Sequence, residues 1–281
     1  MKGFPDKVYL NGEIIDPVAA KISVFDRGFI FGDGIYEAMV QINGRFFYED
    51  AHLKRLDYCL KQIQIDFNVD RLKSEITKLL AASGLTNKDC FLYIQITRGI
   101  APRKHGFPTD VTPTVLMYAV AKTLPEINDL HMETVSMKDF RWERCDIKMT
   151  SLLGNIMANE FAMQNNCYET ILVRDGVVTE ASHCNVFFVK DGIVYTHPAN
   201  EHILNGITRQ IVLEMCDNLN IKVIEEGILF NSIAAMDEAF LTGTSTQIAA
   251  IKRIDGHYFY TNNNIGPVTR RLQEAYRVLK L

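Results

Sequence analysis

Five of the Asn-Gly and Asp-Gly pairs in the chain lie between short runs of β-branched and aromatic residues, and these five constrain its fold more than any other feature. They are Asn11-Gly12, Asn43-Gly44, Asp175-Gly176, Asp191-Gly192 and Asp255-Gly256. Such pairs between strand-like runs are the strongest local signal for a two-residue hairpin turn. Antiparallel sheet is therefore predicted in both halves of the chain, which argues against an open parallel sheet of the Rossmann type.

Apolar residues at helical spacing fill the gaps between these turns. They predict a helix begun by Asp50, a second begun by Asp70 and ended by Gly84, a third over residues 151–166 and a last one from Pro267. Helices of this kind, together with hairpins in both halves, indicate an α+β fold.

A proline-bearing stretch near the middle separates two parts of the chain. Residues 122–126 read Lys-Thr-Leu-Pro-Glu, and Pro125 would interrupt either a helix or a central strand. We therefore predict a small N-terminal α/β domain over residues 1–121, a linker over 122–126 and a larger C-terminal domain over 127–281. Each domain is expected to hold an antiparallel or mixed sheet with flanking helices.

The composition excludes several classes of function. The chain has 281 residues, 47% of them hydrophobic, and its net charge of −4 offers no basic field to nucleic acid. The six cysteines have no paired spacing, and no stretch resembles a leader or a membrane span, so we expect a cytoplasmic protein without disulfides. The HExxH, GxSxG and Walker patterns are missing, which disfavours metal, serine-hydrolase and P-loop chemistry.

Lys148 is the candidate for covalent chemistry. It lies between Ile147 and Met149, after a strand-like run and before the predicted helix over residues 151–166. Partial removal of an amine from water favours its neutral form, and a neutral amine can form a Schiff base. A lysine with apolar neighbours in sequence can equally extend to solvent, so position alone leaves the role of Lys148 open.

Two glycine-bearing turns in the second half could hold an anion. Gly206-Ile207-Thr208 begins a predicted helix, and Gly243-Thr244-Ser245 follows a predicted strand. Each turn taken alone is as well explained by an ordinary helix start or loop. Two of them in one domain favour a bound phosphate.

Charged residues add further candidates, each with an ordinary surface alternative. Glu180 ends a predicted hairpin strand, where its carboxylate would point either into a site or into water. Arg103 and His105 alternate on a loop restricted by Pro102, so both could face one carboxylate. The same residues could also form a solvated basic loop.

Five separated motifs resemble, in order and spacing, those of the fold-type-IV enzymes that use pyridoxal 5′-phosphate (PLP). This family includes the branched-chain and D-amino-acid aminotransferases and aminodeoxychorismate lyase. The resemblance covers essentially the whole chain, and residues 102–108 with 144–148 resemble the D-amino-acid aminotransferases in particular. The motifs are Phe31-Gly32-Asp33-Gly34-Ile35-Tyr36-Glu37, the helix with His52 and Arg55, Arg144-Cys145-Asp146-Ile147-Lys148, Thr179-Glu180-Ala181-Ser182 with Asn185-Val186-Phe187, and Gly206-Ile207-Thr208-Arg209.

The resemblance implies a role for each candidate. Lys148 would carry PLP as a Schiff base and move the substrate Cα proton, while Glu180 would keep the pyridine nitrogen protonated. The resemblance also implies PLP bound between two domains, a homodimer, no metal, and transfer of the amino group of a D-amino acid such as D-alanine to 2-oxoglutarate. The remaining implied roles are phosphate binding by Arg55, Ile207, Thr208 and Thr244, ring packing by Leu204, and a substrate carboxylate trap of Tyr36, Arg103 and His105.

Alternatives on the same fold stay open. A branched-chain L-amino-acid aminotransferase or an aminodeoxychorismate lyase would lack the Arg-x-His trap, and a non-catalytic PLP-binding protein would need no trap. The chain also departs from the family where serines are usual, at His183, Cys184 and Gly243, which predicts fewer hydrogen bonds to the cofactor. His183 and Cys184 are interpreted as neighbours on a strand, so their side chains should face opposite ways and the two are not expected to form a catalytic pair.

Overall fold

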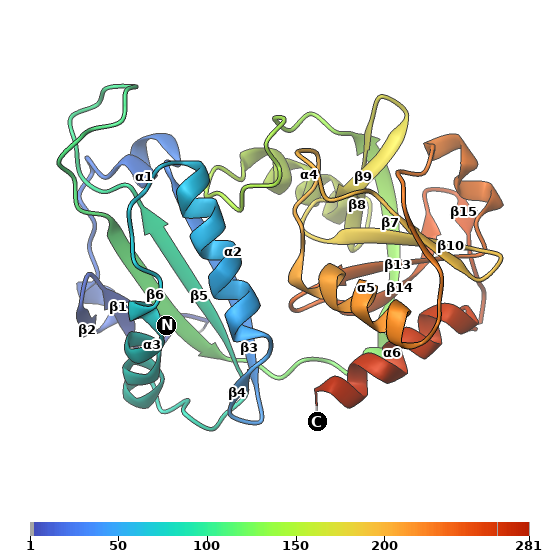
Figure 1. The fold of residues 1–281 in the computed structure, drawn as a ribbon, viewed down its shortest axis with the longest axis horizontal. Helices are drawn as coiled ribbons and strands as arrows, with labels where there is room; N and C mark the ends of the chain where they lie inside the picture. Colours follow the sequence, from blue (N-terminus) through green and yellow to red (C-terminus); the bar gives the residue numbers. More distant parts are fainter. Residues whose placement is uncertain (1–2, 263, 281) are drawn as a thin grey trace. The chain divides into compact units, whose positions relative to one another are not determined.

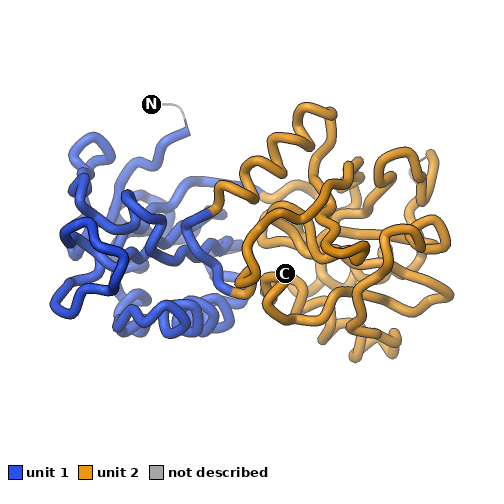
Figure 2. The backbone as a smooth tube through the Cα atoms, turned by 90° about the horizontal axis from the view of Figure 1, so that it is seen from above, with its two compact units in different colours: residues 1–123, 147–151 blue, residues 124–146, 152–281 orange. Residues whose placement is uncertain are grey.

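The chain forms two compact units, coloured separately in Figure 2. The computed structural model describes residues 3–262 and 264–280. Unit 1 comprises Met1–Thr123 with Ile147–Ser151, and unit 2 comprises Leu124–Asp146 with Leu152–Leu281. Both units combine a sheet with helices, so the predicted α+β class is confirmed.

Unit 1 is a six-stranded antiparallel sheet with two long helices (Figure 1). The strand order is β2-β1-β6-β5-β3-β4. Alternate residues of β5 (Leu92, Ile94 and Ile96) are fully buried and join one core with the apolar stripes of α2 and α3. Each fully buried leucine or isoleucine of this kind stabilises the fold by about 1.5–3 kcal/mol. The elements are β1 Val8–Leu10, β2 Glu13–Ile15, η1 Pro17–Ala19, α1 Arg27–Phe31, β3 Gly34–Ile42, β4 Arg45–Phe46, α2 Glu49–Gln62, α3 Arg71–Ala82, β5 Cys90–Thr97 and β6 Thr114–Ala121.

Unit 2 contains a nine-stranded mixed sheet in the order β12-β11-β10-β13-β14-β7-β8-β9, with β15 paired to β14. Its pairs β11·β12, β14·β7 and β7·β8 are parallel. Helix α5 packs on β13, α6 packs on β13 and β14, and α4 packs on β7 and β8. The elements are η2 Ile127–Asp129, β7 His131–Lys138, α4 Leu153–Gln164, β8 Glu169–Arg174, β9 Val177–Ala181, β10 Asn185–Lys190, β11 Ile193–Thr196, α5 Ile207–Asn218, β12 Val223–Glu225, η3 Phe230–Ala235, β13 Glu238–Gly243, β14 Gln247–Ile254, β15 His257–Tyr258 and α6 Pro267–Leu279.

All five predicted hairpin turns are present. They join β1 to β2, β3 to β4, β8 to β9, β10 to β11 and β14 to β15, and every pair is antiparallel. The Asn or Asp of each turn has φ near 50°. This left-handed conformation is one that Asn and Asp tolerate better than other side chains.

The two helices predicted to begin at Asp50 and Asp70 exist, but neither aspartate makes a capping hydrogen bond. Asp50 is already the second residue of α2, whose N-cap is Tyr48 with φ 58° and no side-chain hydrogen bond. Asp70 does occupy the N-cap of α3, but its own backbone is helical and its side chain makes no capping bond. In α2 the acidic pair Glu49 and Asp50 instead lies in the first turn, where the helix dipole favours negative charge.

Residues Ile147–Ser151 belong to unit 1, whereas the sequence-based division assigned them to the second domain. Backbone hydrogen bonds hold this segment along the start of β3: Tyr36 N donates to Lys148 O at 3.0 Å, and Thr150 N donates to Gly34 O at 3.0 Å. The predicted boundary cannot anticipate this excursion, because the segment carries no strand of its own. It places Lys148 among the residues of β3 and α2.

Candidate active site

Lys148 is held in unit 1 by its backbone and by an aromatic ring. Its N–H donates to the Cys59 thiol at 3.3 Å, and its carbonyl accepts from Tyr36 N. The Nζ atom lies 4.1 Å from the centroid of the Tyr36 ring. The side chain is half-buried, so the amine is neither free in water nor sealed in the core.

A buried charge cluster lies close to this lysine. Arg55 on α2 donates to the Glu37 carboxylate through Nε at 2.9 Å and Nη2 at 2.6 Å, and His52 Nδ1 lies 3.0 Å from the same carboxylate. Burial raises the pKa of Glu37, but Arg55 and His52 outweigh burial and hold it well below its ordinary value. Burial lowers the pKa of His52, which favours a neutral imidazole. Arg55, which the resemblance assigns to the cofactor phosphate, is therefore held in place by the carboxylate of Glu37. The sequence does not predict Glu37 as a site residue.

Arg103 and His105 form a second group in unit 1, gathered on one ring. Arg103 Cζ lies 5.2 Å from the centroid of Phe31, and the His105 ring centroid lies 5.8 Å from it. Both side chains are exposed, as a trap for an incoming carboxylate requires. Among the described residues, no hydrogen bond, ion pair or ring contact joins this group to Tyr36.

Glu180 is the buried acid of unit 2. Its Oε1 accepts from Arg141 Nη1 at 2.6 Å, and its Oε2 accepts from Asn185 Nδ2 at 3.0 Å and Leu204 N at 3.1 Å. Burial raises the pKa of Glu180 to about 7, although Arg141 and the Leu204 N–H both favour the ionised form. The sequence does not predict Arg141, since its partners Asp139 and Glu180 converge on it only in the folded sheet.

The start of α5 offers backbone donors close to Glu180. Leu204 contacts Glu180 through its N–H, and Gly206 is the N-cap of α5, where no side chain makes a capping bond. The first N–H groups of a helix have no acceptor inside the helix, so those of Ile207 and Thr208 suit an anion. A Cβ at Gly206 would lie 2.2 Å from Asn185 Oδ1, so glycine is required here by space.

The second predicted anion turn connects β13 to β14 and contains Thr244. Cys184 lies against it, with Sγ 3.2 Å from Thr246 Oγ1. A Cβ at Gly243 would lie 3.2 Å from the Cys184 sulfur, closer than ordinary contact. Two of the three departures from the expected serines thus fit each other: the larger sulfur at position 184 occupies space next to Gly243, which has no side chain.

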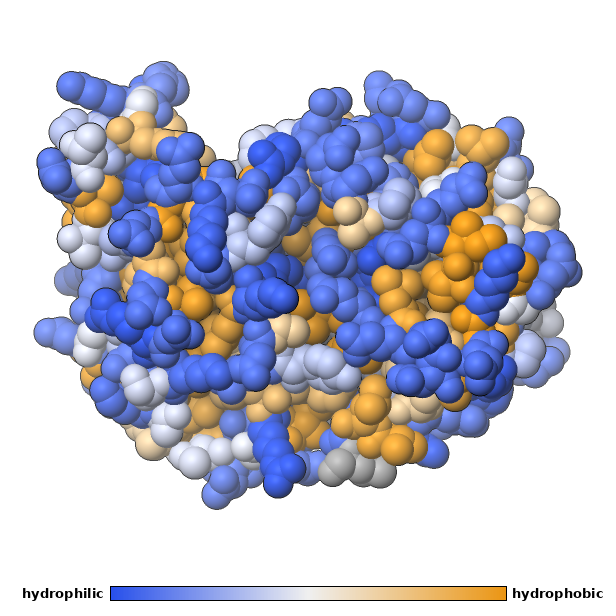
Figure 3. Space-filling model, viewed as in Figure 1, coloured by the Kyte–Doolittle hydropathy of each residue, from blue (hydrophilic) through white to orange (hydrophobic). Residues whose placement is uncertain are grey.

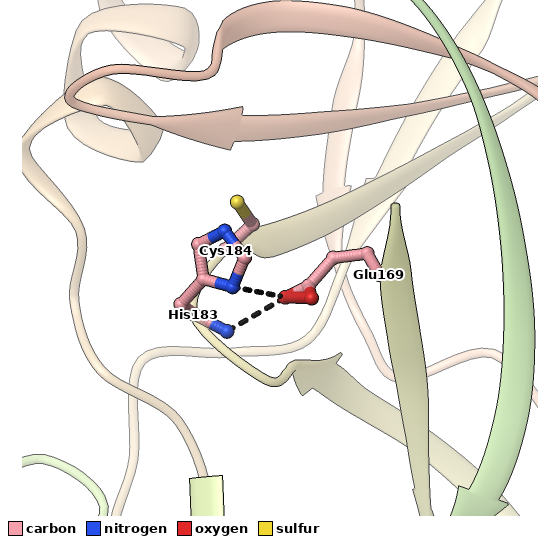
Figure 4. A group of neighbouring side chains, drawn as sticks. All are labelled: Glu169, His183 and Cys184. Carbon is pink, nitrogen blue, oxygen red and sulfur yellow. Dashed lines mark hydrogen bonds and ion pairs between the residues drawn. The ribbon is translucent and has the colours of Figure 1, made fainter. Parts of the chain in front are cut away.

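His183 and Cys184 both place their side chains near Glu169, as Figure 4 shows. They lie in the bend between β9 and β10, so the strand argument that they face opposite ways is wrong. Burial opposes a charge on His183, but Cys184 and Glu169 outweigh it and raise its pKa above the ordinary value.

These three residues form the one potential metal group among the described residues, with donor atoms within 4.8 Å of one another. The Glu169 carboxylate, however, already accepts from Ser182 Oγ at 2.6 Å and from His183 N at 2.7 Å, and it lies 3.1 Å from His183 Nδ1. A carboxylate engaged in this way orients an imidazole and fixes a bend, because its lone pairs are used by protein donors.

Comparison with known proteins shows which family the chain matches. A model of the amino-transferase class IV family matches residues 34–254. The D-alanine aminotransferase of Staphylococcus haemolyticus is 39% identical over 275 residues, which cover 96% of this chain and 96% of that protein.

Solved structures share the fold. A branched-chain aminotransferase from Thermoproteus uzoniensis with norvaline has a TM-score of 0.86 at 26% identity, over 98% of this chain and 94% of that one. The branched-chain amino acid aminotransferase of Escherichia coli has a TM-score of 0.88 at 22% identity, over 98% of this chain and 95% of that one.

Proposed function

The chain belongs to the amino-transferase class IV family, and from this premise we propose that it transfers the amino group of D-amino acids to 2-oxo acids with PLP as cofactor. The observation that carries the proposal is 39% identity to a D-alanine aminotransferase over nearly the whole of both chains. D-Alanine is accordingly the expected donor and 2-oxoglutarate the expected acceptor.

The residues present fit this cofactor. Glu180 is a buried carboxylate whose charged form is disfavoured by burial, so a protonated pyridine nitrogen beside it would stabilise that form, and the uncapped start of α5 suits a phosphate. When bound, PLP supplies an aldehyde carbon for the amino group and a conjugated ring that accepts the electrons of the Cα–H bond.

Each residue then has a defined task. Lys148 Nζ holds the cofactor and moves the substrate Cα proton, and Tyr36 keeps that amine in place. Glu180 holds the proton on the pyridine nitrogen, with Arg141 and Asn185 fixing its carboxylate. The other proposed cofactor contacts are Arg55, Ile207, Thr208 and Thr244 to the phosphate and Leu204 to the ring.

Specificity for the D-configuration rests on the substrate carboxylate. Arg103 offers a planar fork of donors and His105 adds another, and Phe31 holds the two side chains near each other. The position of the bound carboxylate decides which substituent of Cα points toward Lys148, and hence which enantiomer reacts. Tyr36 completes the proposed trap.

A homodimer is proposed from exposed apolar side chains. Leu153, Ile156 and Met157 lie at helical spacing on α4 and are 70%, 61% and 55% exposed, and Phe29 on α1 is 68% exposed. On the face that Figure 3 shows, apolar areas lie among hydrophilic residues. Exposed apolar side chains that gather on one helix are typical of an interaction surface. Ile156→Glu should shift the mass measured by light scattering from dimer to monomer.

A cytoplasmic location is also proposed. The described cysteines are all free and buried, as in proteins kept in a reducing compartment. No helix among the described residues combines the length and the apolar character that crossing a bilayer would need.

The function is tested by incubating the protein with PLP, 2-oxoglutarate and either D- or L-alanine. Pyruvate should form from D-alanine and not from L-alanine, and Lys148→Ala should abolish both turnover and the yellow cofactor absorbance. Turnover of L-donors alone would instead support a branched-chain L-aminotransferase. Cofactor binding without any turnover would support a PLP-binding protein.

A further inference from the structure

We propose that Arg27 and Asp33 are positioning residues that hold the loop carrying Arg103 and His105. The proposal rests on the proposed function for the task of that loop. It gives a role to Asp33, which neither the cofactor nor the substrate residues explain.

Two buried arginines share the carboxylate of Asp33. Arg27 Nε donates to Oδ2 at 2.7 Å, while Arg98 donates through Nε at 2.8 Å and Nη2 at 3.0 Å. Both guanidinium side chains are 4% exposed, and the Asp33 side chain is 10% exposed. Buried charges require partners, so this carboxylate fixes the geometry of both arginines.

Arg27 also donates a hydrogen bond to the loop that carries Arg103 and His105. Its Nη1 donates to the carbonyl of Lys104 at 2.6 Å, and Lys104 stands between Arg103 and His105. Its Cζ also lies 4.7 Å from the centroid of Phe31, the ring on which the two trap side chains rest. One guanidinium therefore holds both the backbone between the trap residues and the ring beneath them.

The base of this arrangement is fixed to the sheet. Arg27 N donates to Gly99 O at 2.9 Å, and Arg98 N donates to Asp33 O at 3.0 Å. Asp26, which caps α1, also accepts from the Thr97 hydroxyl at 2.8 Å. The anchor of the loop is thus the end of β5, while the loop itself contains no regular structure over residues 101–113.

The assignment predicts a kinetic effect confined to substrate binding. Arg27→Met leaves Asp33 paired with Arg98, so neither remaining buried charge loses its partner and the fold is expected to persist. Loss of the bond to Lys104 should raise KM for both D-alanine and 2-oxoglutarate about tenfold, with kcat and the cofactor absorbance unchanged. Arg27→Lys keeps the positive charge but cannot donate to Asp33 and to the Lys104 carbonyl at the same time. It should therefore raise KM as Arg27→Met does. Arg45→Met, which removes an exposed arginine of β4, is the control and should change nothing.

A double-mutant cycle on the holoenzyme decides whether Arg27 acts through the loop. In an Arg103→Ala, His105→Ala background, Arg27→Met should raise KM less than about twofold further. A further tenfold rise in that background would overturn the assignment, because Arg27 would then act elsewhere.

Amide hydrogen exchange gives a readout that needs no turnover. Residues 103–107 should exchange faster in Arg27→Met than in the wild type, with exchange in β5 unchanged. Unchanged exchange in the loop overturns the proposal even if the enzyme is inactive. Faster loop exchange in a protein without transaminase activity would support the anchor and sink only the proposed function. If Arg27→Met does not fold, Arg27→Lys serves in both experiments.

Discussion

The amine of Lys148 lies over the ring of Tyr36, 4.1 Å from its centroid. A cation over an aromatic face is stabilised by about 0.5–2 kcal/mol, and the ring also limits where the lysine side chain can go. The ring and the hydroxyl of Tyr36 therefore have separable effects. Tyr36→Phe should keep the affinity for PLP and raise KM for D-alanine, because only the hydroxyl can bind the substrate carboxylate.

Tyr36→Leu is the matched variant, since it removes the ring as well. It should weaken cofactor binding severalfold in an absorbance titration with PLP. Equal PLP affinity in the Phe and Leu variants would show that the ring does not place Lys148.

The parts of the fold that local sequence determines are predicted well. Each Asn-Gly or Asp-Gly hairpin depends on two residues whose backbone preferences are their own, and all five are present. The start of α5 at Ile207 and of α6 at Pro267 follow from the same kind of local signal. Asp50 and Asp70 do not cap their helices through their side chains. A capping residue needs an extended backbone, whereas Asp50 lies inside α2 and the backbone of Asp70 is helical.

Contacts between side chains that lie far apart in the sequence cannot be predicted from such local signals. Glu37 meets Arg55 across β3 and α2, and Arg27 meets the carbonyl of a residue 77 positions further along the chain. A single sequence shows neither pairing. The prediction of Lys148 as the reactive amine depended on the resemblance to a known family. Its partial burial and its contact with Tyr36 come from residues 147–151, which form no helix or strand that local sequence could indicate.

The raised pKa of Glu180 predicts a pH-dependent stability of the cofactor-free protein. Its folded-state pKa of about 7 exceeds the ordinary 4.5, so the native state binds more protons than the unfolded state between these values. Stability should therefore fall as pH rises from 4.5 to 7, by about 3 kcal/mol from this group alone. Urea unfolding of the wild type and Glu180→Gln across this range isolates the effect, since the amide does not titrate. If the free energy of unfolding changes with pH equally in the two proteins, the prediction is wrong.

PLP should reduce this dependence. A protonated pyridine nitrogen against Glu180 favours its carboxylate form and would lower its pKa. The difference between the wild type and Glu180→Gln should thus shrink when PLP is bound. An unchanged difference would place the pyridine nitrogen away from Glu180.

The fit between Gly243 and Cys184 predicts a compensating pair. Gly243→Ser adds a Cβ that would lie 3.2 Å from the Cys184 sulfur, so it should destabilise the protein by about 1–3 kcal/mol. Cys184→Ser replaces the sulfur with a smaller oxygen, and the double variant should recover part of the loss, because Thr246 Cβ and Oγ1 would still lie 3.3 Å from the added Cβ. Unfolding measurements on all four proteins give the coupling, and additive effects would show that the two sites relax independently.

Arg103→Ala separates substrate binding from cofactor binding. The Arg103 side chain is exposed and rests on Phe31, so its removal should leave the fold intact. A charged hydrogen bond is worth about 1.5–3 kcal/mol, so KM for D-alanine and 2-oxoglutarate should rise about 10- to 100-fold at unchanged cofactor absorbance. Arg103→Lys, which keeps a point charge without the planar fork, should recover only part of the loss. If the yellow absorbance disappears instead, Arg103 holds the cofactor and the substrate trap must be sought elsewhere.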